Sequence, residues 1–304
     1  MDKYKSLFDL GGLSLDRLRN FSLIAEAGGV SRAADGDPTR MSLFSKQVKE
    51  LETYFGVKLT ERQGRNMKLT QAGRTLADLA REQLIGLENF KRTCRGMSQK
   101  LVIASGNSIL EWALIPRLTK AKTALPNTGV EILTGRTQDN IRRLSEMTVD
   151  LALVREDAVV KPLKSKRILR LTYSLFLPKK LAAGINGGNL KRTFASLPMA
   201  TSIGGQFREE LERLANRAGW DLKIDLACSS FTQAAGAVKT GEFGAILPSI
   251  AAVEFNPDTV VEFPLPFMNS YARTIALVWN PRLTEVRPLV AKAIEVLNRE
   301  FGGA

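Results

Sequence analysis

Residues 37–56 read DPTRMSLFSKQVKELETYFG, and this stretch decides the fold of the N-terminal part. Asp37 can accept a hydrogen bond from a free backbone N–H, and Pro38 suits the first position of a helix. We therefore expect a helix from Pro38 to about Tyr54, with Gly56 following it. Apolar residues recur at intervals of three and four, which predicts one buried stripe. The stripe consists of Phe44, Val48, Leu51 and Phe55.

The opposite face of this predicted helix carries small hydrogen-bonding groups and cations. Its members are Thr39, Ser42, Ser45, Lys46 and Lys49. Such a face can enter the major groove of DNA, where cations meet phosphates and small polar groups meet base edges. A solvated amphipathic face is the alternative, and the helix alone does not decide between the two.

The flanking segments predict further elements of a small domain. Upstream, Ser14 can cap a helix that Gly28 ends, and residues 30–34 predict a short second helix. Downstream, two short strands around Gly64 predict a β-hairpin. Residues 38–70 contain seven cations and three anions, so positive charge gathers on one helix and one hairpin.

Composition narrows the class of protein. The 304 residues suffice for two domains, and the net charge of +13 favours nucleic acid first and an anionic membrane second as partners. A soluble protein with a basic surface is the alternative, and charge alone does not decide against it. The chain has no histidine and only Cys94 and Cys228, which excludes Ser-His-Asp and Cys-His catalysis and a disulfide framework. It also has no nucleophile elbow or cofactor fingerprint, so we expect no enzyme activity and no cofactor.

The N-terminus has no secretory signal, and no apolar run reaches the roughly 18–20 residues that span a bilayer. We therefore expect a cytoplasmic protein that does not act at a membrane.

Thr70 can cap a long helix that runs to about Arg95, followed by a hinge at residues 96–98. A heptad-like series of mostly apolar positions on this helix alternates by four and three, which favours pairing with a second helix. The positions are Leu76, Ala80, Gln83, Leu87, Phe90 and Cys94. A helix packed on its own domain is the alternative.

From residue 100 onward, strands and helices alternate, which predicts parallel sheets covered by helices in two α/β lobes with a cleft between them. The first run has predicted strands at 101–104, 130–133 and 149–154 and helices at 108–124, kinked at Pro116, and 137–147. The second run, from about Tyr173, has predicted strands near 198–201, 223–227 and 245–247 and helices at 206–218 and 231–240. A strand at 274–279 and a helix at 285–301 close the chain.

Polar side chains follow the predicted strands, where open α/β sheets bind their ligands. We expect these residues, as a group facing one cleft, to bind a carboxylate-like or other polar ligand, although for each residue alone an ordinary helix cap is the favoured interpretation. They are Asn107, Ser108, Arg136, Thr137, Arg155, Thr201, Ser202, Ser229 and Phe231.

The order and spacing of several N-terminal motifs closely resemble the LysR-type transcriptional regulators. The motifs are Val30–Ala34, Ser45–Glu52, Phe55–Leu59, Arg62 and Leu69–Gly73. The segments Leu101–Ser105, Asp150–Val154 and Gly241–Pro248 resemble the effector-binding domain of the same regulators, which is itself similar to type 2 periplasmic binding proteins.

The resemblance implies an α+β multidomain fold: a winged helix-turn-helix at 1–70, a dimerisation linker helix and hinge at 71–97, and a two-lobed α/β effector domain at 98–304. It implies that a set of residues lies at or near DNA. They are Ser31, Arg32, Thr39, Arg40, Ser42, Ser45, Lys46, Lys49, Arg62 and Arg65. Helical phase places Arg40 nearer the buried side than the others.

The implied partners are double-stranded DNA, a small-molecule effector that is a candidate anion, a second copy of the chain, and RNA polymerase if the protein activates. The effector would shift lobe closure and so the placement of the DNA-binding heads. Dimer or tetramer, and activator or repressor, stay open. The alternative is an architectural DNA-binding protein, or an effector-independent regulator with a filled cleft.

Three residues depart from the family pattern. Asp37 and Thr60 replace residues that are usually apolar, so we expect looser packing around the turn and the hairpin. Met41 replaces a polar residue that often faces DNA, which bears on the operator sequence.

Overall fold

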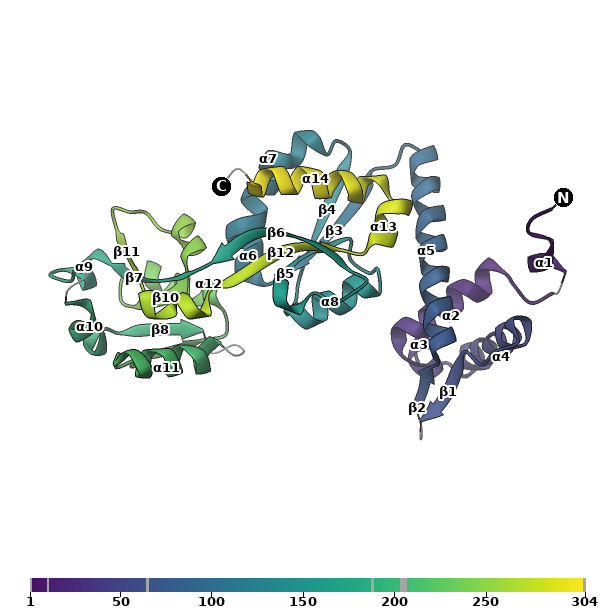
Figure 1. The fold of residues 1–304 in the computed structure, drawn as a ribbon, viewed down its shortest axis with the longest axis horizontal. Coiled ribbons are helices and arrows are strands. Elements are labelled where there is room, and N and C mark those ends of the chain that lie inside the picture. Colours follow the sequence, from purple (N-terminus) through teal and green to yellow (C-terminus); the bar gives the residue numbers. More distant parts are fainter. Residues whose placement is uncertain (1, 10, 64–65, 187–188, 203–206, 303–304) are drawn as a thin grey trace. The chain divides into compact units, whose positions relative to one another are not determined.

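The computed structural model describes residues 2–9, 11–63, 66–186, 189–202 and 207–302 (Figure 1). The chain forms two compact units. The first comprises Met1–Lys100, Ser145–Thr148 and Asn280–Ala291, and the second comprises Leu101–Leu144, Val149–Trp279 and Lys292–Ala304.

The first unit contains the predicted helix-turn-helix. Its elements are α1 (Lys5–Phe8), α2 (Leu15–Ala27), α3 (Val30–Ala33) and α4 (Pro38–Phe55). Ser14 caps α2 by accepting from the N–H of Arg17, and Asp37 caps α4 by accepting from two N–H groups of its first turn. Gly28 and Gly56 end the helices with φ angles of 67° and 66°, which glycine adopts without steric strain.

The core of this unit lies under the predicted stripe of α4. Phe44, Val48 and Leu51 are buried and pack with residues of α2. The stripe was predicted to include Phe55, which is wrong, because its side chain is 37% exposed at the last helical position.

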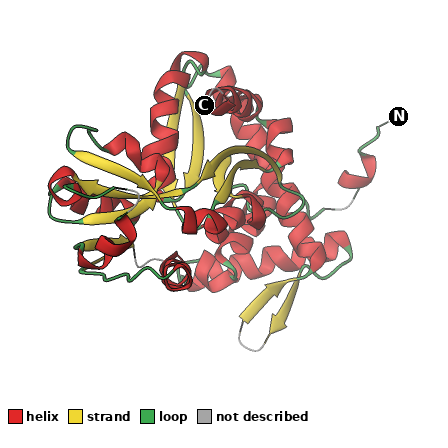
Figure 2. Cartoon of the chain, turned by 60° about the vertical axis from the view of Figure 1, so that its left-hand side comes forward, coloured by secondary structure: helices red, strands yellow, loops and turns green. Residues whose placement is uncertain are grey.

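The predicted hairpin follows α4 and consists of β1 (Thr60–Gln63) and β2 (Asn66–Leu69). The two strands pair antiparallel, with Thr60 opposite Leu69. In Figure 2 the pair projects beyond the helices of its own domain. This is the wing of a winged helix-turn-helix.

The long helix α5 (Gln71–Cys94) begins at Thr70, whose hydroxyl accepts from the N–H of Gly73 at 3.0 Å. Its predicted pairing stripe is not continuous. Leu76 packs against the helix-turn-helix core and Ala80 is buried, whereas Leu87 and Phe90 are 50% and 68% exposed. Gln83 and Cys94 are exposed as well. The buried side of the first turns therefore belongs to the DNA-binding domain, while Leu79 and the apolar side chains of the later turns stay uncovered.

The second unit holds two five-stranded sheets. The first has the order β4-β3-β5-β12-β6 and the second the order β11-β7-β10-β8-β9. The strands of the first are β3 (Gln99–Ser105), β4 (Thr128–Thr134), β5 (Leu151–Arg155), β6 (Lys164–Leu171) and β12 (Arg273–Trp279). Those of the second are β7 (Tyr173–Pro178), β8 (Met199–Ser202), β9 (Leu226–Cys228), β10 (Gly244–Pro248) and β11 (Val260–Pro264).

The expectation of purely parallel sheets is wrong. β3 and β5 are parallel, as are β8 and its neighbours β9 and β10, but β12 is antiparallel to β5 and β6, and β7 is antiparallel to β10 and β11. β6 and β12 are the crossing segments between the lobes (Figure 1). Alternation of strands and helices predicts parallel neighbours only where a helix connects them directly.

β6, β7 and β11 were not among the strands expected from the sequence. β6 is an edge strand whose first four residues, KSKR, are exposed. Lysine on an edge strand opposes pairing with another chain. Because these charged residues interrupt the alternation of apolar and polar residues, the hydrophobicity pattern does not predict a strand here.

Helices cover both sheets. The principal ones are α7 (Ile115–Ala121), α8 (Thr137–Ser145), α11 (Phe207–Ala218), α12 (Phe231–Lys239) and α14 (Pro288–Gly302), whereas α13 (Pro281–Val286) belongs to the first unit. Short turns of helix are α6 (Asn107–Ile109), η1 (Leu110–Leu114), η2 (Lys122–Ala124), η3 (Glu156–Ala158), α9 (Lys179–Ala182), α10 (Leu190–Thr193), η4 (Phe194–Ser196), η5 (Ser249–Glu254) and η6 (Pro266–Tyr271).

Two prolines shape these helices. The predicted helix at 108–124 contains the π-helical turn η1 just before Pro116, which cannot donate a backbone hydrogen bond. The single closing helix predicted at 285–301 is instead α13 and α14, because Pro288 disfavours helical geometry at Arg287. No helix in the described ranges is long and apolar enough to cross a membrane.

Candidate DNA-binding surface and effector site

The outward face of α4 presents the side chains that the sequence singled out. Thr39, Ser42, Ser45, Lys46 and Lys49 are all exposed, on the side opposite the buried stripe. Lys46 lies 4.0 Å from the carboxylate of Glu50, a loose ion pair one helical turn away. The Lys46 side chain is 74% exposed, so its ammonium can still reach a phosphate.

α3 and the first turn of α4 add three cationic or polar groups. Ser31 and Arg32 are exposed, and the Arg32 guanidinium donates to the carbonyl of Gly28 at 2.5 Å. Arg40 was expected nearer the buried side than the others, and its guanidinium carbon lies 5.6 Å from the ring centre of buried Phe44. The side chain is nevertheless 46% exposed, and its guanidinium lies 3.4 Å from Asp35. Arg32 and Arg40 are thus held at the surface by their own domain.

The three departures from the family pattern each have a structural consequence. Looser packing was expected at Asp37 and Thr60, but both side chains form hydrogen bonds, Asp37 with the first turn of α4 and Thr60 with Glu52. Met41 is partly buried and packs on the core of the domain. It therefore contributes little to the outward face.

The two predicted wing cations fall at the edge of the described part of the chain. Arg62 belongs to β1, but its side chain lies outside the described residues. Arg65 lies outside them altogether.

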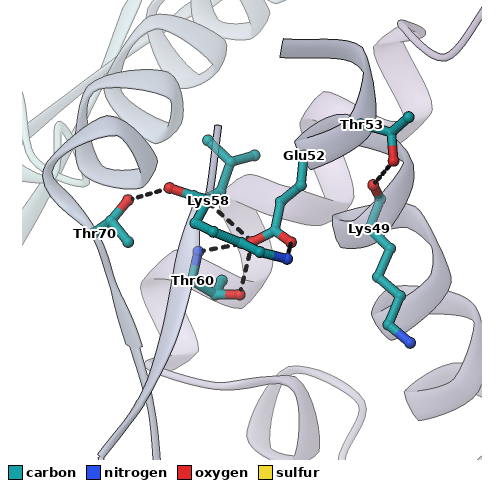
Figure 3. Close-up of polar contacts among 7 residues, drawn as sticks. Lys49, Glu52, Thr53, Lys58, Thr60 and Thr70 are labelled. Carbon is teal, nitrogen blue, oxygen red and sulfur yellow. Dashed lines mark hydrogen bonds and ion pairs between the residues drawn. The ribbon is translucent and has the colours of Figure 1, made fainter. Parts of the chain in front are cut away.

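Glu52 is the residue that sequence reasoning missed. It lies near the end of α4 with only 9% of its surface exposed, and one carboxylate oxygen accepts from the N–H groups of Leu59 and Thr60 at 2.9 and 3.1 Å (Figure 3). The Thr60 hydroxyl donates to the same oxygen at 3.2 Å, and the Lys58 ammonium binds the other at 3.0 Å. Glu52 thereby fastens the start of the wing to α4.

The electrostatics of Glu52 follow from these contacts. Burial by itself raises the pKa of this carboxyl, but the Lys58 ammonium and the two backbone N–H groups outweigh it and hold the pKa below its usual value. One signal in the sequence could have identified Glu52 as a buried carboxylate. It lies four residues after buried Val48, so it falls on the edge of the apolar stripe of α4.

The predicted effector residues fall into two groups in the second unit. On the first lobe, the Asn107 amide donates to Glu111 at 2.7 Å and to Thr232 of α12 at 3.1 Å, which joins the two lobes. Arg155 lies 3.4 Å from Asp157. Ser108, Arg136 and Thr137 are accessible at the starts of their helices.

On the second lobe, Thr201 and Ser202 are buried at the end of β8, and Phe231 begins α12. The side chain of Ser229 donates to Gln233, while Ser230 is the residue that caps α12. Ser229 therefore stays exposed and is not the helix cap.

Trp112 provides a second connection between the lobes. It comes from η1 in the first lobe, is 2% exposed, and packs into the hydrophobic cluster around α12 and β10 of the second lobe. Its indole N–H is buried and meets no hydrogen-bond acceptor among the described residues. The lobes thus share apolar packing as well as the bond between Asn107 and Thr232.

An exposed cationic helix within a winged helix-turn-helix, together with a two-lobed α/β domain, defines a DNA-binding transcription regulator with an effector-binding domain. The chain belongs to the LysR family of bacterial regulatory helix-turn-helix proteins. The model of that helix-turn-helix matches residues 15–74, and the LysR substrate binding domain matches residues 94–302.

Curated relatives agree with this membership. A probable RuBisCO transcriptional regulator of Synechocystis sp. is 27% identical over 304 residues, covering 93% of this chain and 86% of that protein. The HTH-type transcriptional regulator DgdR of Burkholderia cepacia is 27% identical over 249 residues, covering 79% of each.

Solved structures share the fold. The crystal structure of full-length CbnR complexed with its target DNA matches with a TM-score of 0.54 at 20% identity, covering 95% of this chain and 100% of that one. A full-length OxyR variant from Pseudomonas aeruginosa matches with a TM-score of 0.59 at 17% identity, covering 95% of this chain and 94% of that one. Members of this family are transcription regulators rather than enzymes.

Proposed function

We propose that the outward face of α4 enters the major groove of an operator, with Ser31 and Arg32 beside it and Arg62 and Arg65 of the wing on the adjoining backbone. The observation that carries this proposal is the separation of faces on α4. Its buried stripe holds the helix on the domain, while every predicted DNA-contacting side chain on α3 and α4 is exposed. Lys46 and Lys49 then meet phosphates, and Thr39, Arg40, Ser42 and Ser45 are the candidates for base edges.

We further propose a division of labour along the chain. Residues 1–70 bind DNA, residues 71–97 join two copies, and residues 98–304 bind a small-molecule effector. The nine predicted effector residues remain candidates for that second site, and contact with RNA polymerase would follow if the protein activates. Because DNA is the target, the proposed place of action is the bacterial cytoplasm.

The test is the salt dependence of operator binding. An operator would be selected from random duplexes by the full-length protein, and its affinity measured over a range of salt concentrations. Lys46→Gln with Lys49→Gln should weaken binding and lower the slope of log K against log salt by about one for each phosphate that the variant no longer neutralises. The matched control is Lys166→Gln, an exposed lysine of β6. An unchanged slope in the double variant would contradict the proposed role of α4.

A further inference from the structure

A short arm precedes the helix-turn-helix. It consists of residues 2–9 and ends with α1, and it lies outside the part of the chain that the family's helix-turn-helix matches, which starts at residue 15. In Figures 1 and 2, α1 projects from the other helices of its unit. The arm is thus an addition to the DNA-binding domain of this chain.

The root of the arm is fixed to the end of α4. The Tyr54 hydroxyl donates to the carbonyl oxygen of Leu7 at 2.6 Å. Gly12 adopts a φ angle of 133°, and a Cβ there would lie 3.3 Å from the Cβ of Tyr54. An arm that is held at its root loses less conformational entropy when a partner covers it.

The arm exposes three large apolar side chains. Tyr4, Leu7 and Phe8 are 65%, 42% and 76% exposed, and α1 has no buried residue. Nothing among the described residues covers them. Exposed apolar side chains that lie together in this way mark contact surfaces.

The charge of the arm does not suit DNA. Asp2 and Asp9 balance Lys3 and Lys5, so residues 2–9 have no net charge. Contact with phosphates needs an excess of cations. An apolar patch on a neutral arm instead suits an apolar protein surface.

The later turns of α5 offer such a surface. Leu87 and Phe90 are 50% and 68% exposed. Pairing of two α5 helices alone covers them incompletely, because a continuous seam needs an apolar residue at every third or fourth position and Gln83 interrupts it. Since the arm and this part of α5 are both exposed within one chain, neither covers the other there.

We propose that the arm is an exchanged contact between two copies of the chain. Tyr4, Leu7 and Phe8 of one copy pack on Leu87 and Phe90 of the other. In a dimer with two-fold symmetry the contact occurs twice, and each copy covers the apolar surface that the other exposes. This inference rests on the proposed function, in which residues 71–97 join two copies.

Sedimentation velocity of the full-length protein over a range of concentrations measures the contact. Leu7→Asp with Phe8→Asp should raise the dissociation constant of the dimer about ten- to hundredfold, because these side chains no longer gain from burial on assembly. The matched control is Lys3→Gln with Lys5→Gln, which makes the same arm more negative by the same amount and should leave the constant unchanged. All four positions are exposed, so the substitutions remove no core packing. Unchanged assembly in the aspartate variant would overturn the proposal.

The exposed Cys94, four residues after Phe90, allows a direct test of the contact. In Asp9→Cys, which keeps the apolar side chains of the arm, a short bismaleimide should join residue 9 of one copy to Cys94 of the other. The product is a covalent dimer that peptide mapping identifies, and adding Cys94→Ser should remove this link. A link within one chain only, or none although Cys94 reacts with a monofunctional maleimide, would contradict the exchange.

Leu87→Asp with Phe90→Asp separates the arm from the proposed function. If this variant dissociates and the arm variant does not, α5 still joins two copies and only the arm contact is wrong. If neither variant dissociates, the proposed role of residues 71–97 fails together with the inference.

Discussion

At the scale of single residues, Glu52 stabilises the DNA-binding domain by joining α4 to the wing. A carboxylate usually faces solvent, yet this one is buried between α4 and the wing and accepts from three donors of Leu59 and Thr60. The carboxylate takes the place of the water molecules that those two backbone N–H groups would otherwise need as hydrogen-bond acceptors. The orientation of the wing relative to α4 therefore depends on one side chain.

Glu52→Gln should destabilise the protein by about 1–3 kcal/mol at neutral pH, because a charged acceptor of several hydrogen bonds becomes neutral. The pKa of Glu52 is lowered in the folded state, so its contribution is present above the pKa of an unfolded glutamate and is lost as pH falls through the folded pKa. Denaturant unfolding at several pH values should thus show the variant and the natural protein converging in acid.

The control for Glu52 is Glu61→Gln, which changes an exposed carboxylate on the same hairpin. It should leave stability close to that of the natural protein. A constant difference between Glu52→Gln and the natural protein at every pH would contradict the assigned role.

At the scale of elements, two glycines of α5 differ in how closely a neighbouring segment approaches them. A Cβ at Gly73 would lie 2.0 Å from the carbonyl oxygen of Leu59, which is backbone and cannot move aside cheaply. A Cβ at Gly86 would meet the nearest atom, in Val286 of α13, at 3.6 Å, an ordinary contact. The intrinsic helix propensity favours alanine over glycine equally at both positions. The effects of the two substitutions therefore differ only through packing.

Gly73→Ala should therefore destabilise the DNA-binding domain by several times RT, whereas Gly86→Ala should stabilise α5 by about 0.5–1 kcal/mol, the cost of glycine inside a helix. Thermal unfolding of the two variants beside the natural protein measures both effects. Similar effects of the two substitutions would show that the close approach of α5 to Leu59 is not rigid.

At the scale of the whole molecule, the later turns of α5 leave an apolar surface uncovered. Leu79, Leu87 and Phe90 are 47%, 50% and 68% exposed, and they lie on one side of the helix at spacings of eight and three. Exposed apolar side chains in such a row are typical of a helix that pairs with another. We expect a second copy of the chain to cover them, consistent with the oligomers of the family.

Leu87→Asp with Phe90→Asp should convert the oligomer to a smaller species, because charge replaces the apolar contact. Sedimentation velocity over a range of protein concentrations measures the change, and operator affinity should fall with it, since two half-sites are no longer bound together. Lys91→Asp, at an exposed neighbouring position, is the control and should preserve assembly. An unchanged oligomer in the double variant would remove this surface from the interface.

The sequence by itself determined where the N-terminal helices begin and end. Ser14, Asp37 and Thr70 cap helices, and Gly28 and Gly56 end them, because capping needs only groups within three or four residues of each other. The outward face of α4 followed from helical period for the same reason.

Only the tertiary structure decided which parts of the chain meet. The antiparallel position of β12 and the division of α5 between a buried and an exposed part both depend on segments distant in sequence. The burial of Glu52 depends on the wing folding back onto the end of α4. Pairing of distant segments is set by the total packing of the core, and no periodicity within one segment encodes it.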